Sequence, residues 1–337
     1  MLKYIVKRLA YAVLILLGVS LIIYFLIRMM PVDYIRSKID ALNQGGATIS
    51  EEQVQAMYEA YGLADTTNMN FGEKIASYAK GWTGWLAAML KGDLGTSFKY
   101  GIPVAQKIGE CMWLSFAVAL IATVFEFMIA IPLGITAATH QYSLRDYVVT
   151  VLVMIGISLP SFFFGNILKD LFALKLGWFP VNGLLSGGKD LVGFPRLMDQ
   201  LWHMVIPILT MVILSIGGRM RMTRTNMLEV LNSDYIRTAR AKGLKESVVI
   251  NKHAFRNTLI PLVTGLAGLL PGLFSGAIIT EQVFDLPGIG NVALLAMNSG
   301  DIPFIMGYNM FLAVLSVLGI LMADLMYGIV DPRVKLG

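Results

Sequence analysis

Long apolar runs with almost no charge dominate the sequence, and they limit the fold more than any other feature. A helix needs about 20 residues to cross a hydrocarbon core about 30 Å thick. The 337 residues are 56% hydrophobic and 15% charged, whereas soluble domains carry roughly 25% charge. We therefore expect an all-α polytopic membrane protein. Its about six transmembrane helices are predicted at residues 9–26, 113–139, 147–168, 204–218, 259–280 and 304–330.

The first run follows three basic residues, as the core of a secretory signal peptide does. It is longer than the 7 to 15 residues of such a core, and Arg28 and Met29 stand where small residues would precede a cleavage site. We expect an uncleaved first helix.

Basic residues near the ends of the runs predict the orientation, because Lys and Arg in short loops stay on the cytoplasmic side. Residues 284–303 contain no Lys or Arg and are expected outside. The basic segment at residues 219–256 is expected to be cytoplasmic. It contains Arg219, Arg221, Arg224, Arg237, Arg240, Lys242, Lys245, Lys252 and Arg256. With six spans, both termini are then cytoplasmic.

This topology divides the chain into four parts. Residues 1–30 form an N-terminal cytoplasmic stub and the first helix, and residues 31–111 form an external helical insert. Residues 112–330 form a five-helix core with a cytoplasmic loop at 219–256, and residues 331–337 form a cytoplasmic tail.

Two amphipathic helices are predicted in the external insert. Ser50 and Gln53 have capping-box spacing, which predicts a helix start. A second apolar stripe between Ile75 and Met89 is too short and too charged to cross the membrane, and its aromatic face suggests a helix at the bilayer surface. These helices either cover the ends of the spans or dock a partner.

The motifs of enzymes and metal sites do not occur. A nucleotide-binding loop needs Gly-Lys followed by Ser or Thr, but Gly188-Lys189 precedes Asp190. The three histidines lack the spacing of a helical zinc site, and Cys111 is the only cysteine. No span pairs a nucleophile with a histidine. We expect no catalytic residue, no metal, no cofactor bound by this chain and no nucleic-acid partner.

Two acidic residues lie within the predicted spans. Glu126 is near the centre of the second span and Asp324 lies in the last. A charge at mid-bilayer costs roughly 2.5–3.5 kcal/mol on insertion scales, so each is expected to have a role. They either pair with a neighbouring helix or act as proton relays.

Glycine and proline mark irregular helices. Gly268, Gly272 and Gly276 recur every four residues beside Pro271, which favours close packing and a bend in the fifth span. The packing is either within the chain or against a partner chain in the membrane. In the third span, residues 158–161 (Ser-Leu-Pro-Ser) predict a break.

The basic segment contains a predicted helix–turn–helix. Ser233 or Asp234 caps a short helix that Gly243 ends, and Ser247 caps a second helix through Phe255. Ile236, Ala239 and Gly243 fall on one face, which suits insertion into a groove of a partner. The alternative is a basic loop bound to anionic lipid headgroups.

The sequence resembles the membrane permease subunits of bacterial ABC importers for dipeptides and oligopeptides over nearly its whole length. The motifs that carry this resemblance are residues 4–9, 62–65, 92–97, 103–104, 158–162, 177–183, 234–243, 281–290 and 331–333. Each is weak alone, but their order and spacing are specific to this family.

The resemblance implies roles for individual residues. In such permeases the cytoplasmic EAA loop carries coupling helices that enter a cleft of an ATPase subunit. Here residues 237–239 (Arg-Thr-Ala) replace its Glu-Ala-Ala, and residues 253–256 replace its Ile-x-Leu-Pro, so no role of the missing glutamate is transferred. The implied coupling residues are Tyr235, Ile236, Ala239, Gly243 and Arg256. The implied translocation path contains Gly268, Gly272, Ser275 and Gln282.

The resemblance also implies the assembly. A related second permease, two cytoplasmic P-loop ATPases that hold ATP and Mg, and an external solute-binding protein would work with this chain within membrane lipids. The alternatives are import of a nickel complex, glutathione or an oligosaccharide by the same architecture, or a self-sufficient secondary transporter.

Overall fold

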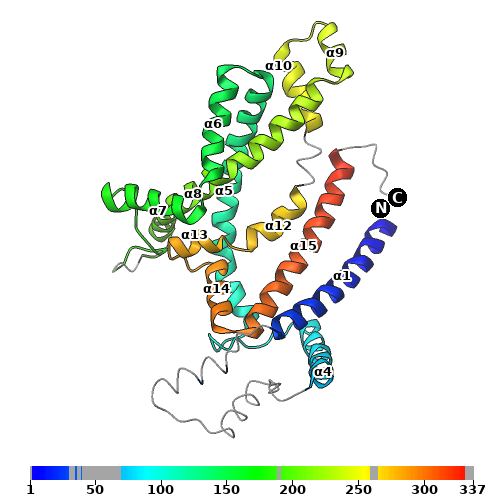
Figure 1. Cartoon of the computed structure of the whole chain (residues 1–337), viewed down its shortest axis with the longest axis vertical. Coiled ribbons are helices and arrows are strands. Elements are labelled where there is room, and N and C mark those ends of the chain that lie inside the picture. Colours follow the sequence, from blue (N-terminus) through cyan, green and yellow to red (C-terminus); the bar gives the residue numbers. More distant parts are fainter. Residues whose placement is uncertain are drawn as a thin grey trace. The chain divides into compact units, whose positions relative to one another are not determined.

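The computed structural model describes residues 2–29, 35, 39, 70–187, 191–258 and 265–330. Every regular element within these ranges is a helix (Figure 1). The described helices are α1 (Leu2–Arg28), α4 (Phe71–Leu90), α5 (Val104–Thr139), α6 (Leu144–Ser158), α7 (Ser161–Leu168), the π-helix η1 (Lys169–Lys175), α8 (Phe194–Leu231), α9 (Asp234–Ala241), α10 (Glu246–Val248), the π-helix η2 (Val249–Ala254), α12 (Leu266–Phe274), α13 (Ile278–Val283), α14 (Ile289–Ser299) and α15 (Ile302–Val330).

Four of these helices are long and apolar enough to cross a membrane: Val6–Arg28, Val104–Thr139, Phe194–Leu231 and Ile302–Met326. They confirm the first, second, fourth and sixth predicted runs as helices of spanning length. The all-helical class is therefore confirmed, whereas the number six stays a prediction.

The third predicted run is not a straight helix. α6 ends at Ser158 and α7 begins at Ser161, and α6 bends by 102° relative to the helix of α7 and η1. Pro160 lies at the N-cap of α7, where its missing N–H costs no hydrogen bond, and it restricts Leu159 to an extended conformation. The break predicted at residues 158–161 is therefore confirmed.

The fifth predicted run begins at residues 259–264, which lie outside the described residues. Its described part also contains a break, because α12 ends at Phe274 and α13 begins at Ile278. Gly276 between them has a φ of +74°, a conformation that favours glycine.

The chain divides into two compact units. The first comprises the described parts of Met1–Trp113 together with Val292–Val317, and the second comprises the described parts of Leu114–Asn291 together with Leu318–Gly337.

In the first unit, α4 packs against α1. Asn70 caps α4 through a reciprocal pair of hydrogen bonds with Glu73, a capping box that the sequence analysis missed. The Trp82 indole donates to Ser20 Oγ at 3.3 Å, and Tyr78 packs edge-on against Phe25. The apolar stripe predicted between Ile75 and Met89 is thus a helix that covers part of the first span. The helix predicted at Ser50 lies outside the described residues.

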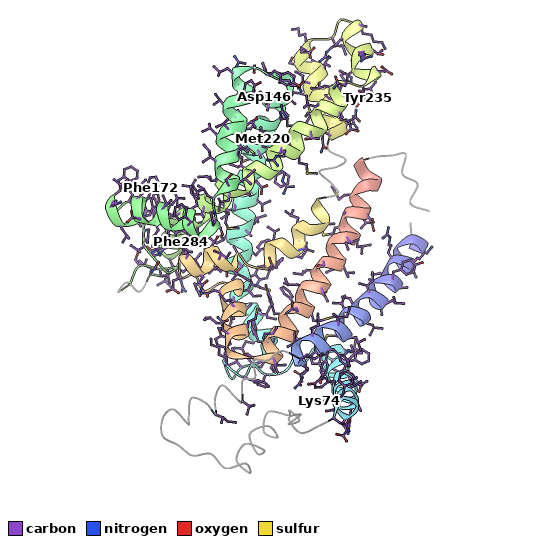
Figure 2. The ribbon with its side chains drawn as sticks, viewed as in Figure 1. Lys74, Asp146, Phe172, Met220, Tyr235 and Phe284 are labelled. Carbon is purple, nitrogen blue, oxygen red and sulfur yellow. The ribbon has the colours of Figure 1, made fainter. Side chains whose placement is uncertain are left out.

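In the second unit, α5, α6 and α8 pack together through apolar side chains. Ala130, Ala137 and Met220 are buried at the centre of this contact, with Val149 and Val153 of α6 beside them (Figure 2 labels Met220). Gly134 of α5 lets the helices approach, since an added Cβ would lie 2.7 Å from the Thr223 side chain of α8.

Candidate functional site

The helix–turn–helix of the basic segment is formed by α9, the turn at Gly243, α10 and η2, and we call it the α9–η2 segment. Gly243 has a φ of +75°, so the predicted glycine turn is confirmed. The second helix begins at Glu246 with Lys245 at its N-cap, and Ser247 therefore lies inside the helix. The prediction that Ser247 caps it is wrong.

The buried face of this segment belongs to the protein's own core. Ile236 and Ala239 have exposed fractions of 0% and 8%, and they pack with Met227 of α8. Ala138 of α5 and Val249 of η2 complete the same cluster. Burial of an aliphatic side chain contributes about 1.5–3 kcal/mol, so this cluster holds α9 to the ends of α5 and α8.

This packing corrects the prediction that Ile236 and Ala239 insert into a groove of a partner. Their side chains are enclosed by the chain itself. The outward face of α9 carries Arg237 and Tyr235. Tyr235, which Figure 2 labels, is 46% exposed. Gly243 and Arg256 are also exposed. Burial is a tertiary property, and periodicity alone did not distinguish the face that packs inside from a face that docks outside.

An ion pair joins the two arms of the segment. Arg240 Nη2 lies 2.6 Å from Glu246 Oε1. The hydrogen bond from Arg240 lowers the pKa of Glu246, and the same bond raises the pKa of Arg240. Both side chains line a hollow of about 660 Å³ between the end of α5 and the segment.

Two further ion pairs explain why α8 continues past Gly218 to Leu231. Arg219 Nε donates to Glu126 Oε1 of α5 at 3.1 Å. Arg224 donates two hydrogen bonds to Asp146 at 3.1 and 2.8 Å (Figure 2 labels Asp146). The first part of the basic segment is therefore helix and not loop. Of the two roles predicted for Glu126, pairing with a neighbouring helix is confirmed. The second acidic residue, Asp324, is half-buried on α15.

The predicted pathway residues do not gather at one place. Gly268 and Gly272 line one cavity of about 340 Å³, and an added Cβ at either would have no atom within 4 Å. Ser275 is the C-cap residue that follows α12, and Gln282 is exposed on α13. Of the three predicted glycines, Gly276 has a close backbone approach, since an added Cβ would lie 2.4 Å from the Gly290 backbone nitrogen. A second close approach is at Gly319 of α15, where an added Cβ would lie 2.2 Å from the Ala267 carbonyl oxygen.

The motif at residues 281–290 forms a cradle around a buried carboxylate that the sequence analysis did not single out. Glu281 is 2% exposed, and its Oε1 accepts a hydrogen bond of 2.6 Å from Ser115 Oγ of α5. Its Oε2 accepts from the Asn291 backbone N–H at 2.8 Å. An added Cβ at Gly288 would lie 2.4 Å from Glu281 Cδ. The glycines of this motif therefore make room for the carboxylate.

The motif at residues 177–183 is joined by hydrogen bonds to residues 283–284 of the motif that contains Glu281. Lys169 Nζ donates to the Val283 carbonyl oxygen at 2.8 Å and to Asn182 Oδ1 at 3.0 Å, and Gly183 N–H donates to the Phe284 carbonyl oxygen. Phe284 is buried among apolar residues that include Phe172 (Figure 2). Two motifs about a hundred residues apart thus form one connected unit.

A second missed carboxylate lies in the first unit. Asp301 is fully buried, and it accepts hydrogen bonds from Ser97 Oγ and from the backbone N–H groups of Phe98 and Lys99. The motif at residues 92–97 therefore ends by wrapping this carboxylate. The contact between Asp301 and residues 97–99 could not be predicted from the spacing of the motifs, because the partners are about 200 residues apart in the sequence.

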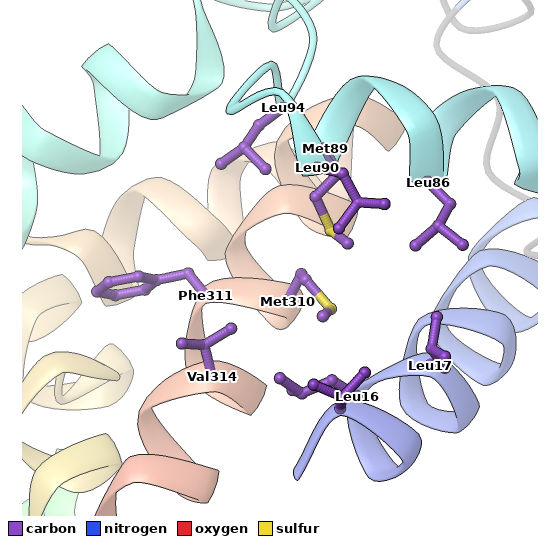
Figure 3. Close-up of a pocket in the computed structure, with 10 residues that line it drawn as sticks. Leu16, Leu17, Leu86, Met89, Leu90, Leu94, Met310, Phe311 and Val314 are labelled. Atoms are coloured by element: carbon purple, nitrogen blue, oxygen red, sulfur yellow. The ribbon is translucent and has the colours of Figure 1, made fainter. Parts of the chain in front are cut away.

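The first unit also holds an apolar groove of about 400 Å³ (Figure 3). Leu16 and Leu17 of α1, Leu86 of α4 and Met310 and Phe311 of α15 line it.

Comparisons with known proteins identify the family. A family model described as "Binding-protein-dependent transport system inner membrane component" matches residues 130–336. A second model, described as "Binding-prot-dependent transport system membrane comp, N-term", matches residues 1–119.

Relatives match over the full length. The oligopeptide transport system permease protein AppB of Bacillus subtilis (strain 168) is 35% identical over 99% of this chain and 100% of its own. The dipeptide transport system permease protein DppB of Escherichia coli (strain K12) is 31% identical over 99% of both chains.

A solved structure described as inward facing conformations of the MetNI methionine ABC transporter has a similar fold. The TM-score is 0.51 at 16% identity, over 67% of this chain and 97% of that chain. Together with the full-length relatives and the apolar helices, these matches show that the chain is a multi-pass protein of the bacterial inner membrane and belongs to the family of inner-membrane components of binding-protein-dependent transport systems.

Proposed function

We propose that this chain is a permease subunit that moves dipeptides or oligopeptides into the cytoplasm by alternating access, driven by separate ATPase subunits. The relatives named as oligopeptide and dipeptide permeases support the substrate class. The single observation that carries the mechanism is the shared core of the α9–η2 segment with α5 and α8. A force applied to α9 is transmitted to these two helices, because close-packed interiors transmit displacement.

The coupling residues take two different roles in this proposal. Tyr235 and Arg256 are exposed and contact the ATPase, and Gly243 fixes the turn between the two arms. Ile236 and Ala239 anchor α9 inside the chain. The exposed Arg237 and Lys242 offer charge to carboxylates of the ATPase.

The assembly in this proposal contains one copy of this chain, a related second permease, two P-loop ATPases and an external solute-binding protein. ATP and Mg bind to the ATPases, and this chain holds no cofactor and catalyses no covalent step. Six spans put both termini and the α9–η2 segment in the cytoplasm and residues 31–111 outside. The absence of Lys and Arg from residues 284–303 supports this orientation.

The translocation path in this proposal runs past Gly268 and Gly272, whose cavity supports that assignment. Ser275 and Gln282 lie near the break between α12 and α13, where a hinge would move them. A nickel complex, glutathione or an oligosaccharide is the alternative cargo.

Affinity purification of the tagged chain from its native membrane in mild detergent tests the proposal. We expect a second permease, two P-loop ATPases and ATPase activity that a peptide-loaded binding protein stimulates. Ligand screening of the recovered binding protein then distinguishes peptides from the alternative cargoes. Recovery of the chain alone, under conditions that preserve other membrane complexes, would instead favour a self-sufficient transporter.

A further inference from the structure

A cavity of about 340 Å³ lies between α5, α8 and α12, and one charged side chain, Arg219, lines it. The proposed transport cycle assigns no role to this arginine. Thr123 of α5, Met211 and Arg219 of α8, and Gly268 and Gly272 of α12 line it. Among the described residues of its wall, Arg219 is the one ionisable side chain. The cavity lies wholly within the second unit of the chain.

Arg219 is held in a fixed orientation. Its Nε donates to Glu126 Oε1 at 3.1 Å, and its guanidinium carbon lies 4.4 Å from the centre of the Phe127 ring. A guanidinium carries five N–H donors, and the bond to Glu126 uses the one on Nε. The four donors on the two terminal nitrogens are not used by Glu126. The side chain keeps 22% of its surface exposed.

The chemistry of this group selects a carboxylate. The planar fork of arginine binds carboxylates through two parallel N–H···O bonds, and such charge-assisted bonds are stronger in a site of low dielectric. The volume of 340 Å³ is near the lower end of the roughly 300–1,000 Å³ of small-ligand pockets. It therefore suits the end of a peptide more than a long chain.

Part of the cavity wall that α12 forms has no side chains. Gly268 and Gly272 present no side chain, and a Cβ added at either would meet no atom within 4 Å. A wall of this kind imposes little selection on neighbouring groups of a ligand. The cavity thus combines one strong polar contact with little discrimination elsewhere.

We propose that Arg219 binds the C-terminal α-carboxylate of the peptide during its passage, as a specificity-determining residue of this permease. This inference rests on the proposed function. The carboxylate is the feature that unmodified linear peptides share whatever their side chains, so one arginine recognises many peptides. Glu126 and Phe127 position Arg219 and do not contact the peptide.

The alternative is that the ion pair only holds α5 to α8. A double variant, Arg219→Gln with Glu126→Gln, separates the two roles, because it leaves no unpaired charge and keeps a hydrogen-bonding amide on each helix. Arg219→Lys keeps the charge opposite Glu126 but removes the planar fork. Arg221→Gln is the matched control, since Arg221 lies on the same helix but outside the cavity wall.

The experiment uses the whole importer in proteoliposomes with its binding protein. Transport is measured for a dipeptide with a free C-terminus and for the same dipeptide as a C-terminal amide, each at a concentration that saturates the binding protein. The readout is the ratio of the maximal transport rates of the acid and the amide. Working at saturation removes the selection made by the binding protein from this ratio.

We expect the wild type and Arg221→Gln to transport the acid about tenfold faster than the amide, the effect of one charge-assisted contact. The double variant should transport both at the same rate, and Arg219→Lys should give an intermediate ratio. A wild-type ratio in the double variant would overturn the role of Arg219. Transport of neither peptide by the wild-type complex would overturn the proposed function itself, which is a distinct outcome.

Discussion

Gly243 shows how a single backbone conformation organises the coupling segment. Its φ of +75° lies in the left-handed region, and an added Cβ would meet no atom within 4 Å. The demand for glycine at this turn is thus conformational and not steric. A residue other than glycine, Asn or Asp costs roughly 1–2 kcal/mol in this region, and a β-branched residue is least tolerated.

Gly243→Val is therefore expected to abolish peptide uptake while the protein still inserts and its α5–α8 core stays folded. Gly243→Asn is the matched control, because asparagine adopts the left-handed conformation more readily, and it should retain most of the uptake. Uptake by cells and co-purification of the ATPases are measured for both. Normal uptake by the valine variant would contradict a role for this turn in coupling.

Glu281 is the second position where one residue determines local structure. Removal of its carboxylate leaves Ser115 Oγ and the N–H groups of Ala277 and Asn291 without their acceptor. Buried donors left in this way cost about 1–3 kcal/mol each. Glu281→Ala should lower the melting temperature of the purified complex, and Ser115→Ala should lower it less.

Gln282→Ala is the control for this measurement, since Gln282 is the exposed neighbour on the same helix and should melt as the wild type does. Equal melting of the Glu281 and Gln282 variants would mean that the cradle contributes no stability.

At the scale of elements, the link between α9 and α10 depends on pH through Glu246. Its pKa is lowered from the ordinary value of 4.5 by the hydrogen bond from Arg240. A group whose pKa is lowered in the folded state contributes stability above the ordinary value and loses it as the pH falls through the lowered value. Between about pH 5 and pH 8 the stability that the Arg240–Glu246 pair contributes should therefore be constant.

We expect the protection factors of the backbone amides in residues 234–254, which correct hydrogen exchange for its intrinsic pH dependence, to show no effect of the Arg240–Glu246 pair across that range and to fall below about pH 4. The change should be small, because both side chains are about half exposed and solvent screens the pair. Glu246→Gln should have lower protection factors near neutral pH and show no further fall of the protection factors in acid from this group. The same acid response in the variant would assign it to another titrating group.

Helix ends were harder to predict than helix centres. The fourth run was expected to end at Gly218 because arginines follow, yet α8 continues to Leu231 and is about 57 Å long at 1.5 Å per residue. Pairing of Arg219 with Glu126 and of Arg224 with Asp146 neutralises these charges within the helix bundle. The partners come from α5 and α6, so no local pattern in α8 revealed them.

At the scale of the whole molecule, the proposed orientation is tested by labelling single cysteines. Cys111 is buried, and Cys111→Ser provides a background without thiols. Leu244→Cys in the turn after α9 should react with a membrane-impermeant thiol reagent only in inverted vesicles. Lys80→Cys on α4 should react in intact cells, because residues 31–111 are proposed to be outside. The reverse pattern would contradict the topology.

Properties that depend on local composition and spacing could be predicted from the amino-acid sequence. It predicted the helical membrane class, the family, the break near Pro160 and the glycine turn at Gly243. The length of an apolar run, the fixed φ of proline and the conformational freedom of glycine are local properties of the chain, so their effects can be predicted from one sequence.

The three-dimensional packing determines which polar and apolar groups contact one another. It assigned the face of Ile236 and Ala239 to the interior, paired Glu126 with Arg219, and surrounded Glu281 and Asp301 with donors from distant segments. Each of these contacts joins elements far apart in sequence, and burial and pairing arise only when the chain brings such elements together.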